Sequence, residues 1–466
     1  MKKVCDLVNC DLDININKVE SYSNKIEKGD MFVAIKGHFV DHLDYLDDAI
    51  SRGASCVVSD RDVECSIPLI KVDDVNKELI SILSKYYDID LSYFTFIGVT
   101  GTDGKTTTTT MISSLINKFE DCCYIGTNGV MIKDEVFPTS NTTPLVEEFF
   151  YYLNIIKQKN IKKIIMEVSS EALMHDRISF INFFSGGYTN ITGDHLNIHK
   201  TIENYIACKM KFCDLITGNV YINKDDSVLK EKTVNNMITY GFSDDCDCVI
   251  SNYREELKNT FFDITFKNKT YSIESNFLGK YNVYNLCLAF IMLCDIGYDS
   301  DSIVENIKDL NGVLGRRQLL NYSDKFDIIV DYAHTINGTL NIMESVVGKY
   351  NKIYTVVGSA GGREKEKRSS IGKIVLDNSD IVVFTMDDPR YEDVNVIIDE
   401  MIGDYSGDNY VKINDRVDAI NYALDNASDN DVVLILGKGN DNYMAIEDKR
   451  IPYNDINVVK EYFEKM

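Results

Sequence analysis

The chain of 466 residues has few of the features that would assign it to a membrane, secreted or disordered class. No apolar run approaches the roughly 18 residues that a membrane-spanning helix needs. The first residues, Met1-Lys-Lys followed by Asp6, do not resemble a secretory signal. Only 5 prolines occur, and there is no low-complexity or repeated segment. We therefore expect a globular chain in the cytoplasm, without stable membrane insertion.

Two further scarcities narrow the class of protein. The 12 cysteines include no C-x-x-C pair, and the close pairs at 122–123 and 246–248 have no matching second pair, which favours free thiols over zinc or disulfides. The chain has fewer basic than acidic residues, with 49 Lys and Arg against 73 Asp and Glu, so its net charge is −24. That balance argues against nucleic acid as a partner. Any anionic substrate must therefore be bound by local Lys, Arg and backbone amides.

A phosphate-binding loop is the clearest feature that is present. The stretch Gly98-Val-Thr-Gly-Thr-Asp-Gly-Lys-Thr-Thr-Thr108 follows an apolar run and opens a helical pattern. Gly101 and Gly104 let backbone N–H groups converge on an anion, Lys105 can reach the outer phosphates, and Thr106 can hold Mg²⁺. The strict G-x-x-x-x-G-K-[ST] pattern fails at its first glycine, and a shorter T-G-T-D-G-K-T variant stands instead. A Gly/Thr-rich surface turn is the alternative to the ATP site that we expect.

Apolar periodicity predicts an α/β fold of three domains. Residues 1–92 show the short apolar runs of a small α/β module. Residues 93–313 alternate strand and helix patterns around the phosphate loop, which predicts a mostly parallel sheet, with antiparallel hairpins from Cys248 to Ser275. The alternation restarts in residues 314–466, which predicts a Rossmann-like, doubly wound domain. Its predicted strands end in polar residues, where open α/β sheets bind ligands: Asp331, Ser359, Asp387 and Lys438.

Several motifs after the loop together resemble the Mur ligase family. They are Asn141-Thr-Thr-Pro144, Met166-Glu-Val-Ser-Ser170, Thr189-Asn-Ile-Thr-Gly-Asp-His195, Ala207-Cys-Lys209, Asp331-Tyr-Ala-His334, Gly361-Gly-Arg363 and Asp387-Asp-Pro-Arg390. The likeness covers nearly the whole chain and is greatest to members that add the third stem-peptide residue. It implies an ATP-dependent ligase that joins a free amino acid to UDP-MurNAc-L-Ala-D-Glu during peptidoglycan synthesis. No obligate protein partner is evident.

The chemistry of such a ligase accounts for the residue types. A carboxylate is a poor electrophile, so amide formation requires an acyl phosphate, which an amine then attacks through a tetrahedral intermediate. Mg²⁺ and Lys105 can neutralise the charge of the transferring phosphoryl group. Glu167 and His195 each follow a predicted strand and, with Thr106, are suitable metal ligands. A solvated carboxylate and an ordinary loop histidine are the alternatives.

The resemblance further implies that Lys209 is carbamylated and so becomes an anionic ligand for a second Mg²⁺. Lys211 lies two residues away and would point to another face of a helix. An ordinary exposed lysine is the alternative at position 209.

The same resemblance implies binding residues in all three segments. For ATP it points to Gly101, Thr102, Asp103, Gly104, Lys105, Thr106, Thr107, Asn282, Arg316 and Asp331. For the UDP-sugar substrate it points to Ser23, His38, Phe39, Val40, Thr142, Thr143, Ser169, His175 and Arg177. For the incoming amino acid it points to Arg363, Asp387, Asp388, Pro389, Arg390, Gly437 and Asp441.

The chain departs from the family pattern at several places. Tyr22 and Asn24 replace the Asp and Arg of D-S-R, and His175 stands where a Gln is common. Gln318 replaces the Glu of G-R-x-E, Asp388 the Asn of D-N-P-R, and Asp441 the Glu of G-K-G-H-E. Arg390 is retained and suits the distal carboxylate of meso-diaminopimelate, which is therefore the expected amino acid.

Three alternatives stay open. One is a paralogous ligase for lysine or another amino acid. Folylpolyglutamate synthase, a remoter relative, lacks the first segment. A non-catalytic nucleotide-sugar-binding homologue is disfavoured by Lys105, Glu167, His195 and Lys209.

Overall fold

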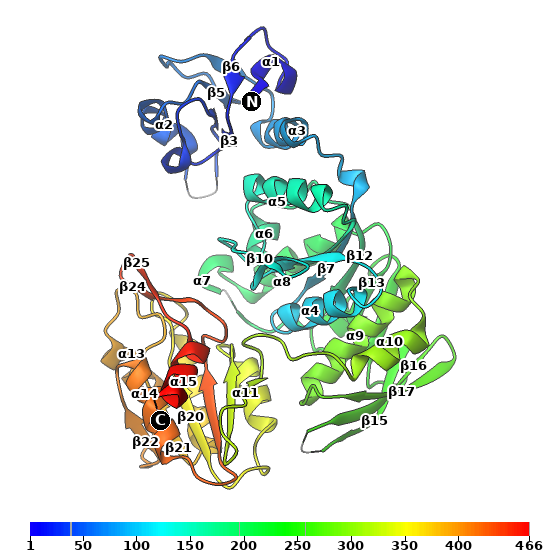
Figure 1. The fold of residues 1–466 in the computed structure, drawn as a ribbon, viewed down its shortest axis with the longest axis vertical. Coiled ribbons are helices and arrows are strands. Elements are labelled where there is room, and N and C mark those ends of the chain that lie inside the picture. Colours follow the sequence, from blue (N-terminus) through cyan, green and yellow to red (C-terminus); the bar gives the residue numbers. More distant parts are fainter. Residues whose placement is uncertain (38–39, 195, 257, 466) are drawn as a thin grey trace. The chain divides into compact units, whose positions relative to one another are not determined.

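The computed structural model describes residues 1–37, 40–194, 196–256 and 258–465, which form two compact units (Figure 1). The first unit comprises Met1–Gly98, Glu120–Gly186 and Cys208–Gly218, and the second comprises Val99–Phe119, Gly187–Ala207 and Asn219–Met466. Both mix helices with mostly parallel strands, so the expected α/β class is confirmed. The domain boundaries expected after residues 92 and 313 remain predictions.

The start of the first unit is a small α/β module. Its parallel sheet has the order β3-β4-β5-β6, formed by Val19–Glu20, Met31–Val33, Cys56–Ser59 and Leu69–Lys71. Helix α2 (Leu46–Arg52) packs its buried residues against strand side chains such as Phe32 and Val57. Helix α3 (Val75–Tyr87) begins at Asp74, whose carboxylate accepts hydrogen bonds from two backbone N–H groups of the first turn. A short pair of strands, β1 (Lys2–Lys3) and β2 (Asn15–Ile16), flanks helix α1 (Val4–Leu7).

The rest of the first unit carries strands in the order β10-β9-β8-β11-β7-β12. Their bounds are Glu135–Phe137, Gly129–Ile132, Cys122–Gly126, Lys163–Glu167, Thr95–Thr100 and Phe183–Tyr188. The pair β8–β11 is parallel, whereas β8–β9 and β9–β10 are antiparallel. Helices α5 (Val146–Gln158) and α6 (Ser170–Met174) precede and follow β11. Strand β7 is buried almost throughout, because it is apolar on both faces, as parallel central strands are.

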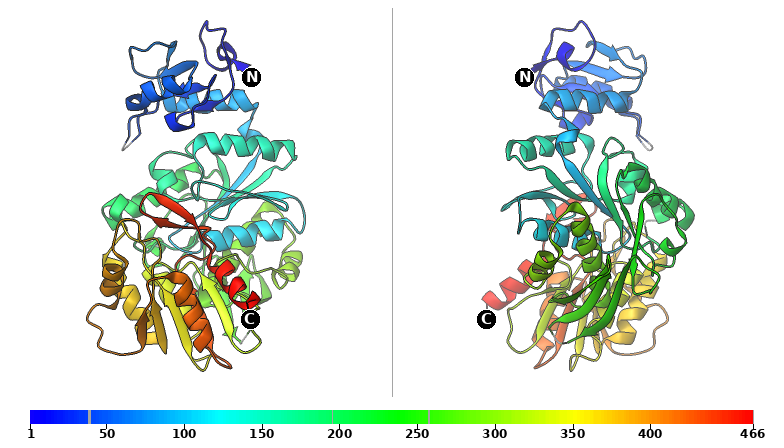
Figure 2. Two further views of the ribbon diagram at one scale, coloured as in Figure 1. Left: turned by 60° about the vertical axis from the view of Figure 1, so that its left-hand side comes forward. Right: turned by 90° about the vertical axis from the view of Figure 1, so that its right-hand side faces the viewer.

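The second unit begins in the phosphate loop and continues through the strand order β12-β13-β14-β15-β16-β17. The last strands are Val220–Asn223, Met237–Gly241, Cys248–Glu255, Thr260–Phe266 and Lys269–Ser275. The final three are antiparallel, which confirms the predicted hairpins, and Figure 2 shows them as one extended ribbon. Helix α4 (Lys105–Ile116) packs against α9 (Lys280–Ile296), which α10 (Ser300–Ile307) follows.

The sequence also predicts a helical pattern from Ile202 to Ile216, and the structure divides this segment. After α7 (Leu196–His199), helix α8 (Ile202–Met210) ends at Met210, and a 3₁₀ turn, Lys211–Leu215, follows it.

The C-terminal sheet has the order β18-β19-β23-β20-β21-β22 and is parallel except for β18. Its strands are Gln318–Leu319, Asp327–Asp331, Val432–Leu436, Ile353–Val357, Ile381–Phe384 and Tyr410–Lys412. A small hairpin, β24 (Tyr443–Ile446) and β25 (Lys449–Pro452), follows it. The sequence predicts strands at residues 326–330, 352–357, 380–384 and 431–436, and the structure confirms each of them to within one residue at each end.

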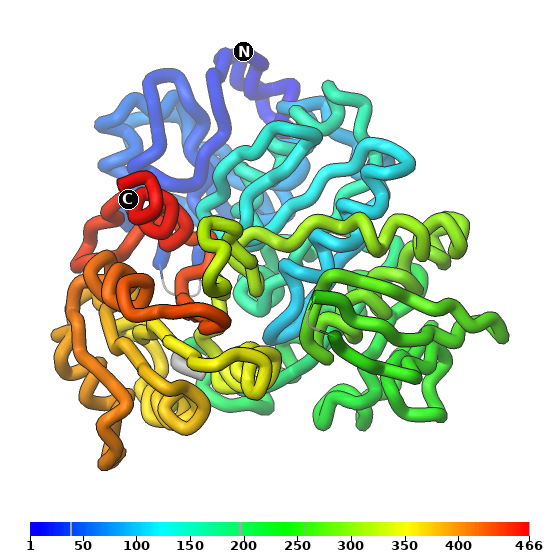
Figure 3. Tube along the Cα trace, turned by 60° about the horizontal axis from the view of Figure 1, so that its bottom comes forward, coloured from blue at the N-terminus to red at the C-terminus, as the bar shows by residue number. Residues whose placement is uncertain are grey.

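Two separate hydrophobic cores cover the two faces of this sheet. On one face lie α11 (Ile336–Glu344), α12 (Glu366–Asn378) and α13 (Val394–Ile402). On the other lie α14 (Arg416–Asn426) and α15 (Asp455–Glu464), which contact each other. Helix α15 forms the red end of the tube in Figure 3. Successive residues of β23 alternate between the cores, Val432 entering one and Val433 the other. This is the doubly wound arrangement that the sequence predicts.

Each of the 12 cysteines is a free thiol in the structure. Among the described residues, no helix combines the length and apolarity that crossing a bilayer requires.

Candidate active site

The phosphate loop joins β7 to α4 through two glycines that no other residue could replace without strain. Gly104 has a φ of +85° and directly precedes the helix. A Cβ atom at Gly104 would lie 2.7 Å from Oδ1 of Asn285, and one at Gly101 would lie 1.9 Å from Oγ1 of Thr189. The strand, glycine turn and helix N-terminus therefore occur in the predicted order.

Lys105 lies folded over the loop. Its Nζ donates hydrogen bonds to the carbonyl oxygens of Gly101, at 2.9 Å, and Thr102, at 2.8 Å. The loop is also held from outside, because Asn190 accepts from the N–H of Asp103 at 3.0 Å and donates to its carbonyl at 3.1 Å. Asn190 belongs to one of the family motifs, but the sequence does not predict its role in fixing the loop.

A cavity of about 340 Å³ in the second unit lies beside the loop. The guanidinium of Arg316 stacks 4.4 Å from the ring centroid of Tyr332 and donates to Oγ1 of Thr106 at 3.1 Å. Oγ1 of Thr335 donates to the Asp103 carboxylate at 3.1 Å. The cavity brings together six predicted ATP residues: Asp103, Gly104, Thr107, Asn282, Arg316 and Asp331.

Two asparagines of α9 form one wall of this cavity. Asn282 is 3% exposed, donates to the carbonyl of Leu278 at 2.8 Å and accepts from Asn285 at 3.2 Å. Oδ1 of Asn285 accepts from Thr108 at 3.2 Å and so links α9 to α4. Sequence reasoning missed Asn285, although its spacing one turn after Asn282 was a usable signal.

Residues at the start of the C-terminal domain also line this cavity, among them Arg316, Arg317 and Asp331. Asp331 accepts hydrogen bonds from the N–H groups of Arg317, at 2.6 Å, and Ala333, at 2.7 Å. Burial raises the pKa of Asp331 above its ordinary value, against the lowering effect of Arg316. The departure at Gln318 keeps an acceptor, since its Oε1 binds the N–H of Gly315 at 2.8 Å.

In the first unit, Glu167 ends β11 as a fully buried carboxylate. It accepts from Tyr124 Oη at 2.6 Å and from the N–H and Oγ1 of Thr127 at 2.9 and 3.3 Å. The alternative that Glu167 is a solvated strand-end carboxylate is therefore wrong. These donors satisfy the carboxylate oxygens of Glu167 in their buried position.

Three predicted substrate residues surround the same strand end. Thr143 Oγ1 contacts the Glu167 carbonyl oxygen at 2.8 Å and Ser169 Oγ at 3.1 Å. Thr142 Oγ1 lies 3.2 Å from Oγ1 of Thr127. Ser169 also begins α6, because its Oγ accepts from the N–H of Ala172 at 3.2 Å. These hydroxyls form one polar cluster in the first unit.

Lys209 is only 1% exposed, whereas Lys211 is exposed. The prediction that the two side chains lie in different surroundings is confirmed, and the alternative of an exposed surface lysine at 209 is wrong. His195 lies outside the described residues, as do His38 and Phe39.

The remaining predicted residues of the UDP-sugar site are in the first unit. Ser23 is 9% exposed, and Val40 is 46% exposed. Burial raises the pKa of Tyr22, the residue before Ser23, and the guanidinium of Arg177 opposes that rise. His175 ends α6 and is half-buried.

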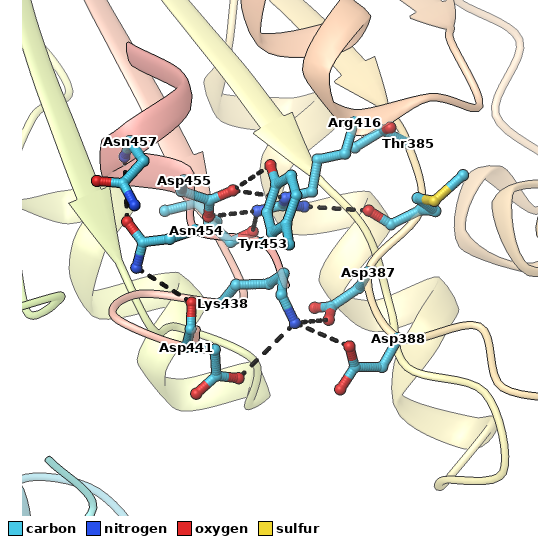
Figure 4. Close-up of polar contacts among 12 residues, drawn as sticks. Thr385, Asp387, Asp388, Arg416, Lys438, Asp441, Tyr453, Asn454, Asp455 and Asn457 are labelled. Atoms are coloured by element: carbon cyan, nitrogen blue, oxygen red, sulfur yellow. Dashed lines mark hydrogen bonds and ion pairs between the residues drawn. The ribbon is translucent and has the colours of Figure 1, made fainter. Parts of the chain in front are cut away.

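A charged cluster lies past the carboxyl ends of β21 and β23 (Figure 4). Lys438 is fully buried, and its Nζ lies 2.8 Å from Asp388, 3.6 Å from Asp387 and 3.8 Å from Asp441. Burial opposes the charge of Lys438, but Asp387 and Asp388 outweigh it and raise its pKa. Burial also raises the pKa of Asp441 to about 7, against the lowering effect of Lys438. Lys438 was predicted only as a polar strand end, not as the centre of this cluster.

The segment that carries Arg390 contacts the loop that contains Gly361 and Gly362, before α12. Arg390 is half-buried, has a φ of +50°, and donates to the carbonyl of Gly361 at 2.5 Å. A Cβ atom at Gly361 would lie 2.0 Å from the carbonyl oxygen of Pro389. Arg363 is exposed on the same loop. A Cβ atom at Gly437, whose φ is +113°, would lie 2.6 Å from Asp387, so the predicted residues of this region lie together.

Comparisons with known proteins agree on one family. The model of the Mur ligase middle domain matches residues 99–293, and that of the Mur ligase, glutamate ligase domain matches residues 315–439. A UDP-N-acetylmuramoyl-L-alanyl-D-glutamate--2,6-diaminopimelate ligase of Clostridium botulinum is 36% identical, over 97% of this chain and 96% of the relative. The enzyme of the same name from Bacillus velezensis is 32% identical, over 96% and 94%.

A solved structure of a ligase with that name superposes with a TM-score of 0.66. The two chains are 26% identical, and the match covers 98% of this chain and 97% of the other.

Proposed function

The chain belongs to the Mur ligase family, and from that premise we propose that it is an ATP-dependent ligase that adds meso-diaminopimelate to UDP-MurNAc-L-Ala-D-Glu. The product is a precursor of peptidoglycan. ATP and a UDP-linked precursor as substrates place the reaction in the cytoplasm.

One observation carries the proposal. The cavity beside the phosphate loop and the charged cluster around Lys438 both lie at the carboxyl edge of the C-terminal sheet. Asp331, which lines the cavity, is the last residue of β19 and pairs in register with Leu436, two residues before Lys438. A ligase needs the activated carboxyl group and the attacking amine side by side, and this edge offers binding groups for both.

The chain's own residues account for nucleotide binding. Backbone N–H groups of the loop and the start of α4 suit the phosphates. Lys105, now bonded to two loop carbonyls, can turn to the outer phosphates. Arg316 and the asparagines of α9 line the remainder of the cavity.

Mg²⁺ takes oxygen ligands and uses one or two carboxylates together with substrate phosphates. The hydroxyl of Thr106 in the second unit and the buried carboxylate of Glu167 in the first unit are each a ligand of this type. When bound, Mg²⁺ neutralises charge on the transferring phosphoryl group. We assign His195 to the same role by family resemblance, and Lys209, as a carbamate, to a second ion. The Lys209 side chain is 1% exposed, which agrees with a role in an interior site and not on the surface.

The acceptor, UDP-MurNAc-L-Ala-D-Glu, is assigned to the first unit. The hydroxyls of Thr142, Thr143 and Ser169 and the guanidinium of Arg177 are suitable partners for its carboxylates and diphosphate. His175 can donate or accept a hydrogen bond there. Ser23 and Val40, with His38 and Phe39, are assigned to the uridine end.

For the incoming amino acid, Arg390 and Arg363 are the groups that suit a distal carboxylate, and Asp441 suits the distal ammonium. Phosphorylation of the acceptor carboxylate gives an acyl phosphate. The free amine then attacks the acyl carbon, forms the amide and expels inorganic phosphate.

The test is to incubate the purified protein with ATP, Mg²⁺ and UDP-MurNAc-L-Ala-D-Glu and to supply amino acids one at a time. We expect phosphate release and a new UDP-linked product by mass spectrometry with meso-diaminopimelate. Product with lysine alone would assign the chain to a paralogous ligase, which the carboxylates at Asp388 and Asp441 keep as the second candidate. Binding of the UDP-substrate without turnover of any amino acid would overturn the enzymatic proposal.

A further inference from the structure

A second buried ion pair lies behind the charged cluster and takes no part in the reaction proposed above. Arg416, the first residue of α14, and Asp455, the first residue of α15, are both fully buried in the side chain. Nε and Nη2 of Arg416 donate to the two carboxylate oxygens of Asp455 at 2.8 and 2.9 Å. Tyr453 donates to the same carboxylate at 2.7 Å (Figure 4).

The remaining N–H groups of Arg416 bind main-chain carbonyls at the carboxyl ends of two strands. Nη1 donates to Met386 at 3.2 Å, and Nη2 donates to Leu436 at 2.9 Å. Met386 directly precedes Asp387 and Asp388, and Leu436 precedes the Gly437-Lys438 turn. One guanidinium therefore connects the two segments that supply most of the charged cluster.

The third segment of the cluster is connected to the same anchor. Asn454 caps the N-terminus of α15, because its Oδ1 accepts a hydrogen bond from the N–H of Asn457 at 3.1 Å. Its Nδ2 donates to the carbonyl of Asp441 at 3.1 Å. The start of α15 thus holds Asp441 through Asn454, and it holds the ends of β21 and β23 through Asp455.

Stability alone is a weak reason for such a pair. Removing two charges from water costs about as much free energy as their attraction returns, so apolar residues of similar volume often serve stability as well. What apolar residues cannot do is donate hydrogen bonds to two carbonyls in a fixed geometry. A planar guanidinium with five N–H donors does this, and lysine cannot reproduce it.

We propose that Arg416, held by Asp455, is a positioning residue of the amino-acid site, which sets the spacing of Asp387, Asp388 and Lys438 by binding the carbonyls that precede them. The role as an amino-acid site rests on the proposed function. The positioning itself rests on the contacts above.

The experiment compares Arg416→Met, Arg416→Lys and a matched control, Tyr354→Phe. Tyr354 is 5% exposed and donates to the carbonyl of Asn426 at 2.9 Å, from near the start of β20 and so at the opposite edge of the same sheet. The KM values for amino acid, ATP and UDP-dipeptide are measured separately. Hydroxylamine replaces the amino acid in a parallel assay, where it attacks the acyl carbon, forms a hydroxamate and releases phosphate without needing the charged cluster.

We expect Arg416→Met to raise the amino-acid KM by about tenfold to a hundredfold, since a displacement of about 1 Å can cost a hundredfold. The KM for ATP and the hydroxylamine-dependent phosphate release should stay near the wild-type values. Arg416→Lys should give an intermediate amino-acid KM, and Tyr354→Phe should leave it unchanged. An unchanged amino-acid KM, or an equal loss in all assays at a retained melting temperature, would overturn the proposal.

Hydrogen exchange provides a readout that does not depend on turnover. In Arg416→Lys, amides of residues 386–388 and 437–439 should exchange faster, with those of β19 unchanged. If the wild type turns over no amino acid, the proposed function is wrong. The exchange rates alone then test whether Arg416 positions the two segments. Unchanged exchange at both segments would contradict it.

Discussion

The phosphate loop and the charged cluster around Lys438 are held in different ways. The loop is one continuous stretch whose shape follows from two glycines and the start of a helix. The cluster is assembled from the ends of β21 and β23 and is anchored by α14 and α15, segments that are dozens of residues apart. Backbone conformation fixes the first region, and long-range ion pairs and hydrogen bonds fix the second.

This difference accounts for two departures from the family pattern, at Asp388 and Asp441, which both lie in the charged cluster. A Cβ atom at either loop glycine would meet a neighbouring atom at 2.7 Å or less, so neither glycine can change without rebuilding the loop. In the cluster, the extra carboxylate of Asp388 is balanced by Lys438 and by the N–H of Ala445 at 2.9 Å. Charge can therefore be redistributed in a cluster of side chains, whereas a backbone turn has no such freedom.

The largest expected effect lies in the loop. Lys105→Ala removes the cation that reaches the outer phosphates, so ligation should fall by about a thousandfold or more. UDP-substrate binding, measured by calorimetry, should persist because its residues are assigned to the first unit. Lys118→Ala, which removes an exposed lysine just after the same helix, is the control. Near-normal turnover of Lys105→Ala would show that the loop does not serve catalysis.

A buried lysine outside both regions should have the next largest effect. Lys209→Ala should lower the rate of ligation on the order of a hundredfold, since a bound metal supplies several kcal/mol. If the missing group is a bridging carbamate, small carboxylates should restore part of the activity. Lys211→Ala is the matched control, being exposed two residues away. Equal losses in the two variants would argue against the assignment of Lys209.

Arg390 tests whether the second region sets specificity. With lysine bound, Arg390 would lack the distal carboxylate, and sites built for a polar group reject analogues without it by about a thousandfold or more. We expect the wild type to prefer meso-diaminopimelate strongly. Arg390→Ala should lose the preference, mainly through weaker use of that substrate. The measurement is kcat/KM for both amino acids on both proteins, and a wild type that prefers lysine would contradict the assignment.

Asp441 should make the second region sensitive to pH where the loop is not. Burial raises its pKa to about 7, so the carboxyl group is protonated below that value and charged above it. Only the charged form attracts an ammonium group, so the amino-acid KM should fall as the pH rises from 6 to 8. Asp441→Asn should flatten this profile, while the KM for ATP should vary little in either protein. The same slope in both proteins would assign the titration to another group.

The smallest expected effect concerns the departure at Gln318. Its Oε1 accepts from the N–H of Gly315, and a glutamate could accept the same bond. Gln318→Glu should therefore change the KM for ATP by less than about threefold. Gln318→Ala should weaken ATP binding by about 1 kcal/mol, which is the net value of one hydrogen bond. A large effect of Gln318→Glu would show that charge matters in the nucleotide region as it does in the cluster.

Local sequence patterns were sufficient for the elements that depend on neighbours along the chain. The strand, glycine turn and helix of the phosphate loop, the hairpins from Cys248 to Ser275 and the strands of the C-terminal sheet all lie where periodicity predicts them. These features depend on backbone conformation and on the burial of alternate residues, and both can be read from a short window of sequence.

Tertiary structure alone decided the rest. The balance of Asp388 by Lys438, the hydrogen bond from Thr108 to Asn285 and the clamp between Arg416 and Asp455 appear in no local pattern. Most join residues dozens of positions apart, and whether a charge is paired depends on which strand ends the fold brings together. Sequence determined the elements and the kinds of chemistry they carry, because those are local. The fold determined the pairing of buried charges, because electrostatic and hydrogen-bond energies depend on distance and burial in space.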